Sequence, residues 1–199
     1  MKISFKRIGL TLLKVAALLL VAKMIGFQTP ELRYDFGPRE PVVIDSPEQL
    51  TVDRFGGSTF VSVKGRADLD KAAAFAKHGV AFNYVLLKEY GTTLVVRTPE
   101  KLDENWADIE RHLGRLSPYR RMPFSRSIRA GFESLFGETI PDDALYLARD
   151  DVPRPNGWNI GAVVFAGLLW VVMAYFFFLH RPRRSENLAS SHQGQPEPA

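Results

Sequence analysis

Few side chains in this sequence are of the types that catalyse reactions or bind metals. The chain of 199 residues contains no cysteine, so a thiol nucleophile, a disulfide and a thiolate-bound metal are excluded. Of its four histidines, His180 and His192 lie beside or within the C-terminal tail, which leaves His78 and His112. Both are interpreted as the ends of short helices, where a histidine interacts favourably with the helix dipole. The alternative, metal binding, would need carboxylates that their spacing does not supply.

The sequence also contains no recognisable pattern of a phosphate-binding loop or of a catalytic acid–base pair. The glycines at Phe55–Ser58 are not followed by the Gly-Lys-Ser/Thr of a phosphate-binding loop. Three acidic pairs would act as acid and base only if burial separated their pKa values, and their positions favour solvated surface: Asp68/Asp70, Asp142/Asp143 and Asp150/Asp151. The sequence therefore predicts no catalytic residue, no metal site and no cofactor.

The most unusual pattern is a run of arginines with no lysine or acidic residue between them. It comprises Arg111, Arg115, Arg120, Arg121, Arg126 and Arg129. Guanidinium groups bind phosphates and carboxylates, so this stretch is a candidate site for an acidic partner or an anionic lipid head group. Tyr119 and Phe124 would also suit single-stranded nucleic acid, but the topology inferred from the flanking charges excludes it as a partner. Ordinary solvated surface, paired with acids elsewhere, is the alternative.

Apolar segments near both ends of the chain predict transmembrane helices. Residues 160–179 contain no charged side chain and match the length of about 20 residues that a helix needs to cross a bilayer. Residues 8–27 are interrupted by Lys14 and Lys23, whose charges must reach an interface or face a partner protein. An uncleaved signal anchor is favoured over a cleaved signal peptide, because the small-residue cleavage pattern before Ala22 is poor.

Basic residues at the outer flanks of both segments predict that the two termini are cytoplasmic. The expected organisation is an N-terminus and first transmembrane helix over 1–27, an extracytoplasmic domain over 28–157, a second helix over 158–180 and a disordered cytoplasmic tail over 181–199. A bacterial inner membrane with a periplasmic or extracellular domain fits this pattern. The net charge of +4 arises at the membrane edges, since residues 28–157 contain 18 basic and 20 acidic side chains.

The central region is predicted to be an α+β domain built on a small sheet or an open barrel. Alternating and β-branched segments predict four strands, at 58–64, 82–87, 92–97 and 144–149. Gly91 lies where the middle two would form a hairpin. Cap residues and helical periodicity predict three helices, over 69–77 after Asp68, over 104–113 after Asp103, and over Ser125–Phe136.

Three short motifs give the chain a resemblance to a known family. They are Val61–Arg66 (VSVKGR), Gly91–Arg97 (GTTLVVR) and Gly114–Leu116 (GRL). Together with the two membrane segments, they resemble the surfeit-locus family of haem-copper oxidase assembly factors. In that family Gly-Trp follows the strand arginine, whereas this chain has Thr98-Pro99. The resemblance implies an outward β-rich domain with a non-catalytic assembly role.

Three functions are therefore considered. The first is a two-pass membrane protein whose outward domain serves another membrane protein as an assembly, scaffold or accessory factor. The second is a lipid- or ligand-binding module in which the stretch Arg111–Arg129 and the apolar helix face of Ile128, Phe132 and Phe136 engage the outer surface of the bilayer. The last is an enzyme that uses His78 and His112.

Overall fold

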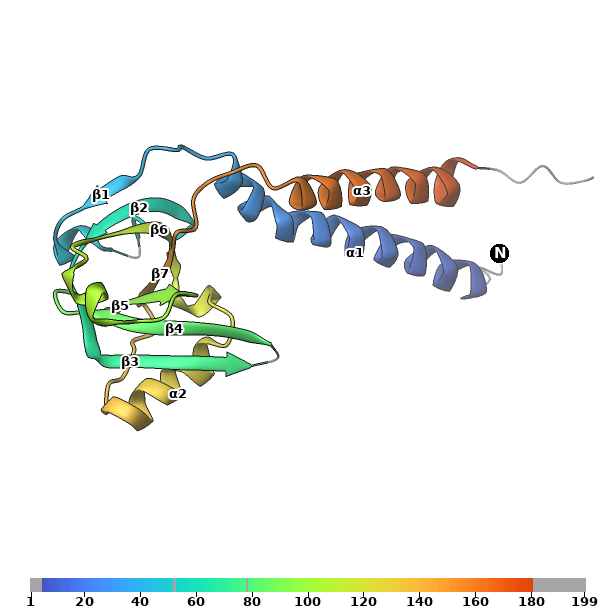
Figure 1. Cartoon of the computed structure of the whole chain (residues 1–199). Helices are drawn as coiled ribbons and strands as arrows, with labels where there is room; N and C mark the ends of the chain where they lie inside the picture. Colours follow the sequence, from blue (N-terminus) through green and yellow to red (C-terminus); the bar gives the residue numbers. More distant parts are fainter. Residues whose placement is uncertain (1–4, 52, 78, 181–199) are drawn as a thin grey trace, which may run out of the picture. The chain divides into compact units, whose positions relative to one another are not determined.

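The computed structural model describes residues 5–51, 53–77 and 79–180 (Figure 1). In order along the chain, the longer elements are α1 (Phe5–Asp35), β1 (Val42–Ile44), β2 (Thr59–Lys64), β3 (Ala67–Lys77), β4 (Val80–Leu87), β5 (Gly91–Thr98), β6 (Arg111–Pro118), α2 (Ser125–Phe136), β7 (Leu145–Arg149) and α3 (Gly157–Ala174). Short 3-10 helices cover Pro47–Gln49, Glu104–Asp108 (η2) and Tyr119–Arg121 (η3), and a π-helical turn over Tyr175–Leu179 follows α3. The chain divides into two compact units, Met1–Ile25 with Val164–Ala199, and Gly26–Val163.

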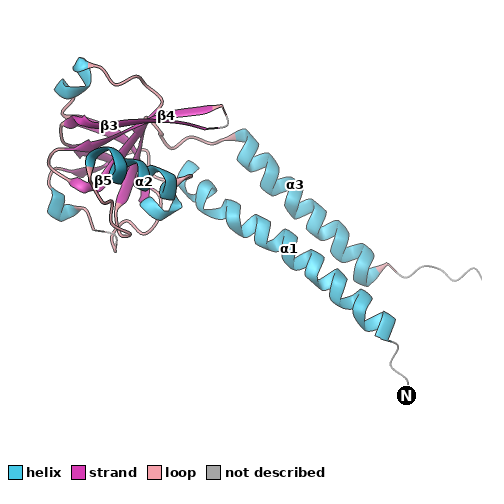
Figure 2. Cartoon of the chain, turned by 90° about the horizontal axis from the view of Figure 1, so that it is seen from below, coloured by secondary structure: helices cyan, strands magenta, loops and turns pink. Residues whose placement is uncertain are grey.

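The first unit contains most of two apolar helices. Both helices are long and apolar enough to cross a membrane, over Ile8–Asp35 and Gly157–Leu179. Within this unit they run side by side in opposite directions (Figures 1 and 2). The Trp170 indole donates to the Leu18 carbonyl oxygen at 3.2 Å. Helix α1 extends beyond the predicted membrane segment of residues 8–27 and continues through Pro30 to Asp35.

The second unit is built on one open, mixed sheet of seven strands in the order β1-β2-β6-β7-β5-β4-β3. The pairs β1/β2 and β5/β7 are parallel, and the other pairs are antiparallel. The predicted strand near 58–64, the hairpin around Gly91 and the strand near 144–149 are confirmed as β2, β4/β5 and β7. Gly91 has φ 52°, a left-handed conformation that glycine adopts without strain.

Each face of the sheet carries its own hydrophobic cluster. One face packs valines and leucines of the central strands under Phe55 and Trp106. The other face packs Tyr84, Leu86, Val95 and Tyr146 against α2, which lies across the sheet in Figure 2. The consecutive buried positions of β4 and β5 follow from this arrangement, because alternate side chains point to opposite faces. The α+β prediction is thus confirmed, with an open sheet as its framework.

The helix predicted over 69–77 is wrong, because these residues form most of strand β3. Ala73, Ala74 and Phe75 pair with residues of β4, and the register shifts between Asp68 and Ala72. The helix preference of alanine is below about 1 kcal/mol per residue. Pairing with β4 and the contacts of Ala73 and Phe75 with the second cluster outweigh it.

The helix predicted over 104–113 is also wrong. Its start after Asp103 is a single 3-10 turn, η2, and the chain then enters β6 at Arg111. Gly114, interpreted as a helix stop, instead permits close strand packing. A Cβ atom at Gly114 would lie 2.1 Å from the carbonyl oxygen of Ala148 in β7.

The third predicted helix is confirmed as α2, with the predicted bounds Ser125–Phe136. Ile128 and Phe132 are buried, with 3% and 0% of their surface exposed. Gly137 ends the helix in the left-handed conformation, with φ 70°. The apolar stripe that identifies this helix in the sequence is therefore the face that packs on the sheet.

Candidate functional site

The arginine stretch does not form one cluster, because its six members lie on three elements. Arg111 and Arg115 lie on the same face of β6, Arg120 and Arg121 in η3, and Arg126 and Arg129 on α2. Arg111 pairs with Asp45 at 2.6 Å, and Arg129 pairs with Asp142 at 2.7 Å. Within the described residues no ion pair involves the exposed side chains of Arg120, Arg121 or Arg126.

Arg115 is the member of this stretch with the richest set of contacts. Its side chain is only 15% exposed, and Nη1 lies 2.5 Å from Glu31 Oε2 while Nε lies 2.9 Å from Asp151 Oδ2. The guanidinium carbon lies 4.0 Å from the ring centroid of Tyr34. Burial alone would lower the pKa of Arg115, but the carboxylates of Glu31 and Asp151 raise it, so the group stays charged.

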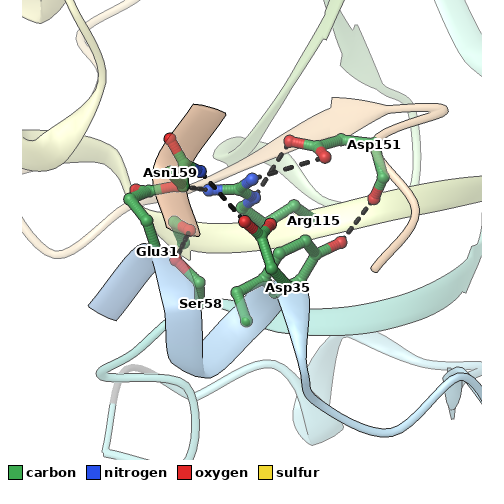
Figure 3. A network of polar contacts seen from close by, with 8 residues as sticks. Glu31, Asp35, Ser58, Arg115, Asp151 and Asn159 are labelled. Carbon is green, nitrogen blue, oxygen red and sulfur yellow. Dashed lines mark hydrogen bonds and ion pairs between the residues drawn. The ribbon is translucent and has the colours of Figure 1, made fainter. Parts of the chain in front are cut away.

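Further hydrogen bonds extend these contacts into a polar network (Figure 3). The Tyr34 hydroxyl donates to the backbone oxygen of Asp151. Asn159, near the start of α3, donates to Asp35 Oδ2 at 2.9 Å. The Arg115 network, defined as Glu31, Tyr34, Asp35, Arg115, Asp151 and Asn159, therefore joins the end of α1, strand β6 and the segment that leads into α3.

Sequence reasoning identified only Arg115 in this network. Asp151 is predicted to be solvated surface, because a pattern within the sequence shows neither ion pairing nor contact across distant segments. The one available signal was the concentration of aromatic and charged residues beside the apolar segments, at Glu31, Tyr34 and Asp35.

The structure places the two lysines predicted to meet a membrane partner on α1. Lys14 Nζ donates to the backbone oxygen of Phe177 at 3.2 Å and lies 5.6 Å from that ring centroid. Carbonyl groups in the last turn of a helix lack intrahelical donors, and a lysine there also interacts favourably with the helix dipole. A contact within the chain thus accommodates the charge of Lys14. Lys23 is exposed on α1.

His112 lies inside β6 rather than at a helix end. It is fully buried, its ring stacks on Trp106 with centroids 5.5 Å apart, and Nε2 lies 3.1 Å from the Gly65 carbonyl oxygen. Burial lowers the pKa of His112 to about 4, so the ring is neutral at pH 7. Nδ1 has no hydrogen-bond partner in the described part of the chain.

The described residues contain no group of three or more histidine and acidic side chains placed to hold a metal ion. His78, the other histidine considered, lies outside the described residues, as does the tail over 181–199. The main feature of the candidate site is therefore the set of polar contacts that link the end of α1 and the segment before α3 to the sheet. No family model matches this chain, and no curated protein or solved structure matches it either.

Proposed function

We propose that this chain is a two-pass membrane protein whose outward domain acts without catalysis as an assembly, scaffold or accessory factor for another membrane protein. In this proposal both termini are cytoplasmic and the sheet domain lies in the periplasm of a bacterial inner membrane. The lengths of the two apolar helices and the basic residues at their flanks support this placement. The motifs that resemble the surfeit-locus family lie in β2 with the two residues after it, in β5 and in β6.

The free edge of the sheet at β3 is the observation that carries the proposal. β3 lies at one end of the strand order and pairs with β4, and no other described strand pairs with it (Figure 1). From Ala72 to Ala76 it carries no charged side chain, and Ala74 and Ala76 are exposed. Proteins usually protect such edges with charges, bulges or a covering segment. The first part of β3 has such features, namely Lys71 and the register shift between Asp68 and Ala72. The stretch Ala72–Ala76 lacks them and can bind an extended strand of another protein through main-chain hydrogen bonds.

The Arg115 network lies within the unit that contains the sheet and orders two of its segments. Glu31 and Tyr34 approach from the end of α1, and Asp151 precedes α3, so Arg115 on β6 contacts both segments. Segments that are ordered before a partner binds lower the entropic cost of association, which suits an accessory factor.

Binding of anionic lipid by the stretch Arg111–Arg129 is the second candidate. The exposed side chains of Arg120, Arg121 and Arg126 favour it. However, Ile128 and Phe132, which were expected to insert into the bilayer, are buried against the sheet. Electrostatic contact alone would remain, and it is readily screened by salt.

The decisive experiment is affinity purification of the full-length protein in mild detergent, with quantitative mass spectrometry of what is retained. We expect a stoichiometric membrane protein to be retained by the wild type and lost with the double variant Ala74→Lys/Ala76→Lys, because edge lysines oppose strand addition. Ser127→Lys/Ala130→Lys, which adds the same two side chains at exposed positions of α2, is the matched control.

A partner that stays bound to the edge variant, or the absence of any stoichiometric partner, would overturn the proposal. Co-flotation of the full-length protein with liposomes cannot separate the candidates, since its helices would insert. The lipid candidate is therefore tested by triple replacement of Arg120, Arg121 and Arg126 with glutamine. The lipid candidate predicts that this triple variant loses a preference for anionic lipid in nanodiscs but still retains the partner.

A further inference from the structure

Arg97 on β5 is a half-buried cation whose environment differs from that of the network arginines. Its guanidinium carbon lies 4.7 Å from the ring centroid of Phe82 and 5.6 Å from that of Tyr146. Among the described residues its side chain makes no hydrogen bond or ion pair. Aromatic contacts use the faces of a guanidinium, whereas its five N–H donors lie in the plane of the group. Arg97 is therefore held in position with its donors unused.

A pocket of about 420 Å³ adjoins this arginine. Its charged lining comes from β5, from the end of β7 and from the segment that leads to α3. These residues are Arg97, Arg149, Asp150, Asp151 and Arg154. Asp150 adopts a left-handed backbone conformation, with φ 61°, which non-glycine residues seldom occupy and which often marks a functional segment.

Existing ion pairs account for three of these five charges. Arg149 lies 2.9 Å from Glu100 and 3.5 Å from Asp150. Asp151 pairs with Arg115 at 2.9 Å. Arg97 and Arg154 are thus the lining cations that have no carboxylate partner in the described part of the chain. Both lining carboxylates are already neutralised by arginine, so the pocket favours an anion over a cation.

We propose that this pocket binds a phosphate group through Arg97 and Arg154. Guanidinium forks match the spacing of phosphate oxygens and form charge-assisted hydrogen bonds with them. A phosphate held by both residues would link β5 to the segment between β7 and α3. That segment also supplies Asp151 to the Arg115 network, so the bound anion would reinforce the attachment of the sheet to the start of α3.

The same chemistry is presented by free phosphate compounds and by phospholipid head groups, and the experiment distinguishes these sources. Full-length protein is prepared in nanodiscs of phosphatidylcholine alone, and binding of inorganic phosphate is measured by isothermal titration calorimetry at constant ionic strength. A parallel arm compares nanodiscs that contain phosphatidylglycerol. Saturable binding of inorganic phosphate identifies a soluble ligand. Competition against it by phosphatidylglycerol identifies a lipid head group.

Arg97→Gln and Arg154→Gln are each expected to weaken phosphate binding by about tenfold or more, the effect of losing a charged hydrogen-bond donor. Lys88→Gln removes an equal charge from an exposed position in the turn between β4 and β5 and should leave the affinity unchanged. Arg154 is exposed, so its variant tests the pocket even if replacement of Arg97 impairs folding. Absence of saturable binding in both arms, or equal loss with Lys88→Gln, would overturn the proposal.

Discussion

The buried imidazole of His112 should make the stability of the sheet domain depend on pH. Its pKa falls from the usual 6.5 to about 4 because burial penalises the charged ring. Between these two pH values His112 is protonated in the unfolded chain but neutral in the native protein, so the free energy of unfolding falls as pH falls. Linkage over this interval predicts a loss of about 2 kcal/mol between pH 7.5 and pH 5, and about 3 kcal/mol once pH is below 4.

The substitution that tests this account is His112→Phe, which retains an aromatic ring beside Trp106 and removes the titrating group. Arg149, Glu89 and Asp150 also act on the pKa of His112. These residues are the same in both proteins, so contributions to the pH dependence that do not involve His112 cancel when the two pH dependences are subtracted. The relevant quantity is the difference between pH 7.5 and pH 5 within each protein, which does not depend on how stable the variant is.

Urea unfolding of the full-length protein in mild detergent provides the assay. Fluorescence of Trp106 reports on the domain when Trp158 and Trp170 are replaced by phenylalanine. With an unfolding slope of about 2 kcal/mol per molar urea, the wild-type midpoint should fall by about 1 M between pH 7.5 and pH 5. The variant should lose about 2 kcal/mol less than the wild type over the same interval. An equal loss in both proteins would show that His112 is not the titrating group and would refute the reasoning.

Two further outcomes are expected. Arg115→Gln should destabilise the domain by about 2 kcal/mol, because the guanidinium is mostly buried while its carboxylate partners remain partly exposed. Arg111→Gln should lower the free energy of unfolding by less than about 1 kcal/mol, because the Arg111–Asp45 pair is exposed. Equal midpoint shifts in urea would contradict this difference. In whole cells with a permeable outer envelope, a membrane-impermeant maleimide should label Ala130→Cys but not Ser190→Cys, and the native chain supplies no cysteine background. Labelling of the tail residue would contradict the proposed topology.

The strands and the helix that the sequence predicts correctly are those with strong local signals. The hairpin around Gly91 combines β-branched residues with a turn glycine, and α2 combines an amphipathic stripe with a terminal glycine. The two helices that are long and apolar enough to cross a membrane follow from length and apolarity alone. In each case the residues that decide the structure lie within a few positions of one another.

The candidate site depended on distant parts of the chain. Arg115 was identified by its residue type, but its partners Glu31 and Asp151 are separated from it in sequence, and only folding brings them together. The pocket at Arg97 likewise combines β5 with a segment beyond β7. A run of arginines gives the number of charges in a stretch, but it does not show which of them are already paired.

The sequence by itself determined the two apolar helices, the α+β class of the central domain and the absence of cysteine chemistry. Only the tertiary structure decided that Ala73 to Phe75 form a strand and that His112 lies in the core. The physical reason is that helix preference, capping and periodicity are local and each contributes about 1 kcal/mol or less per residue. Strand pairing and burial act between distant residues, and their combined contribution outweighs those local preferences.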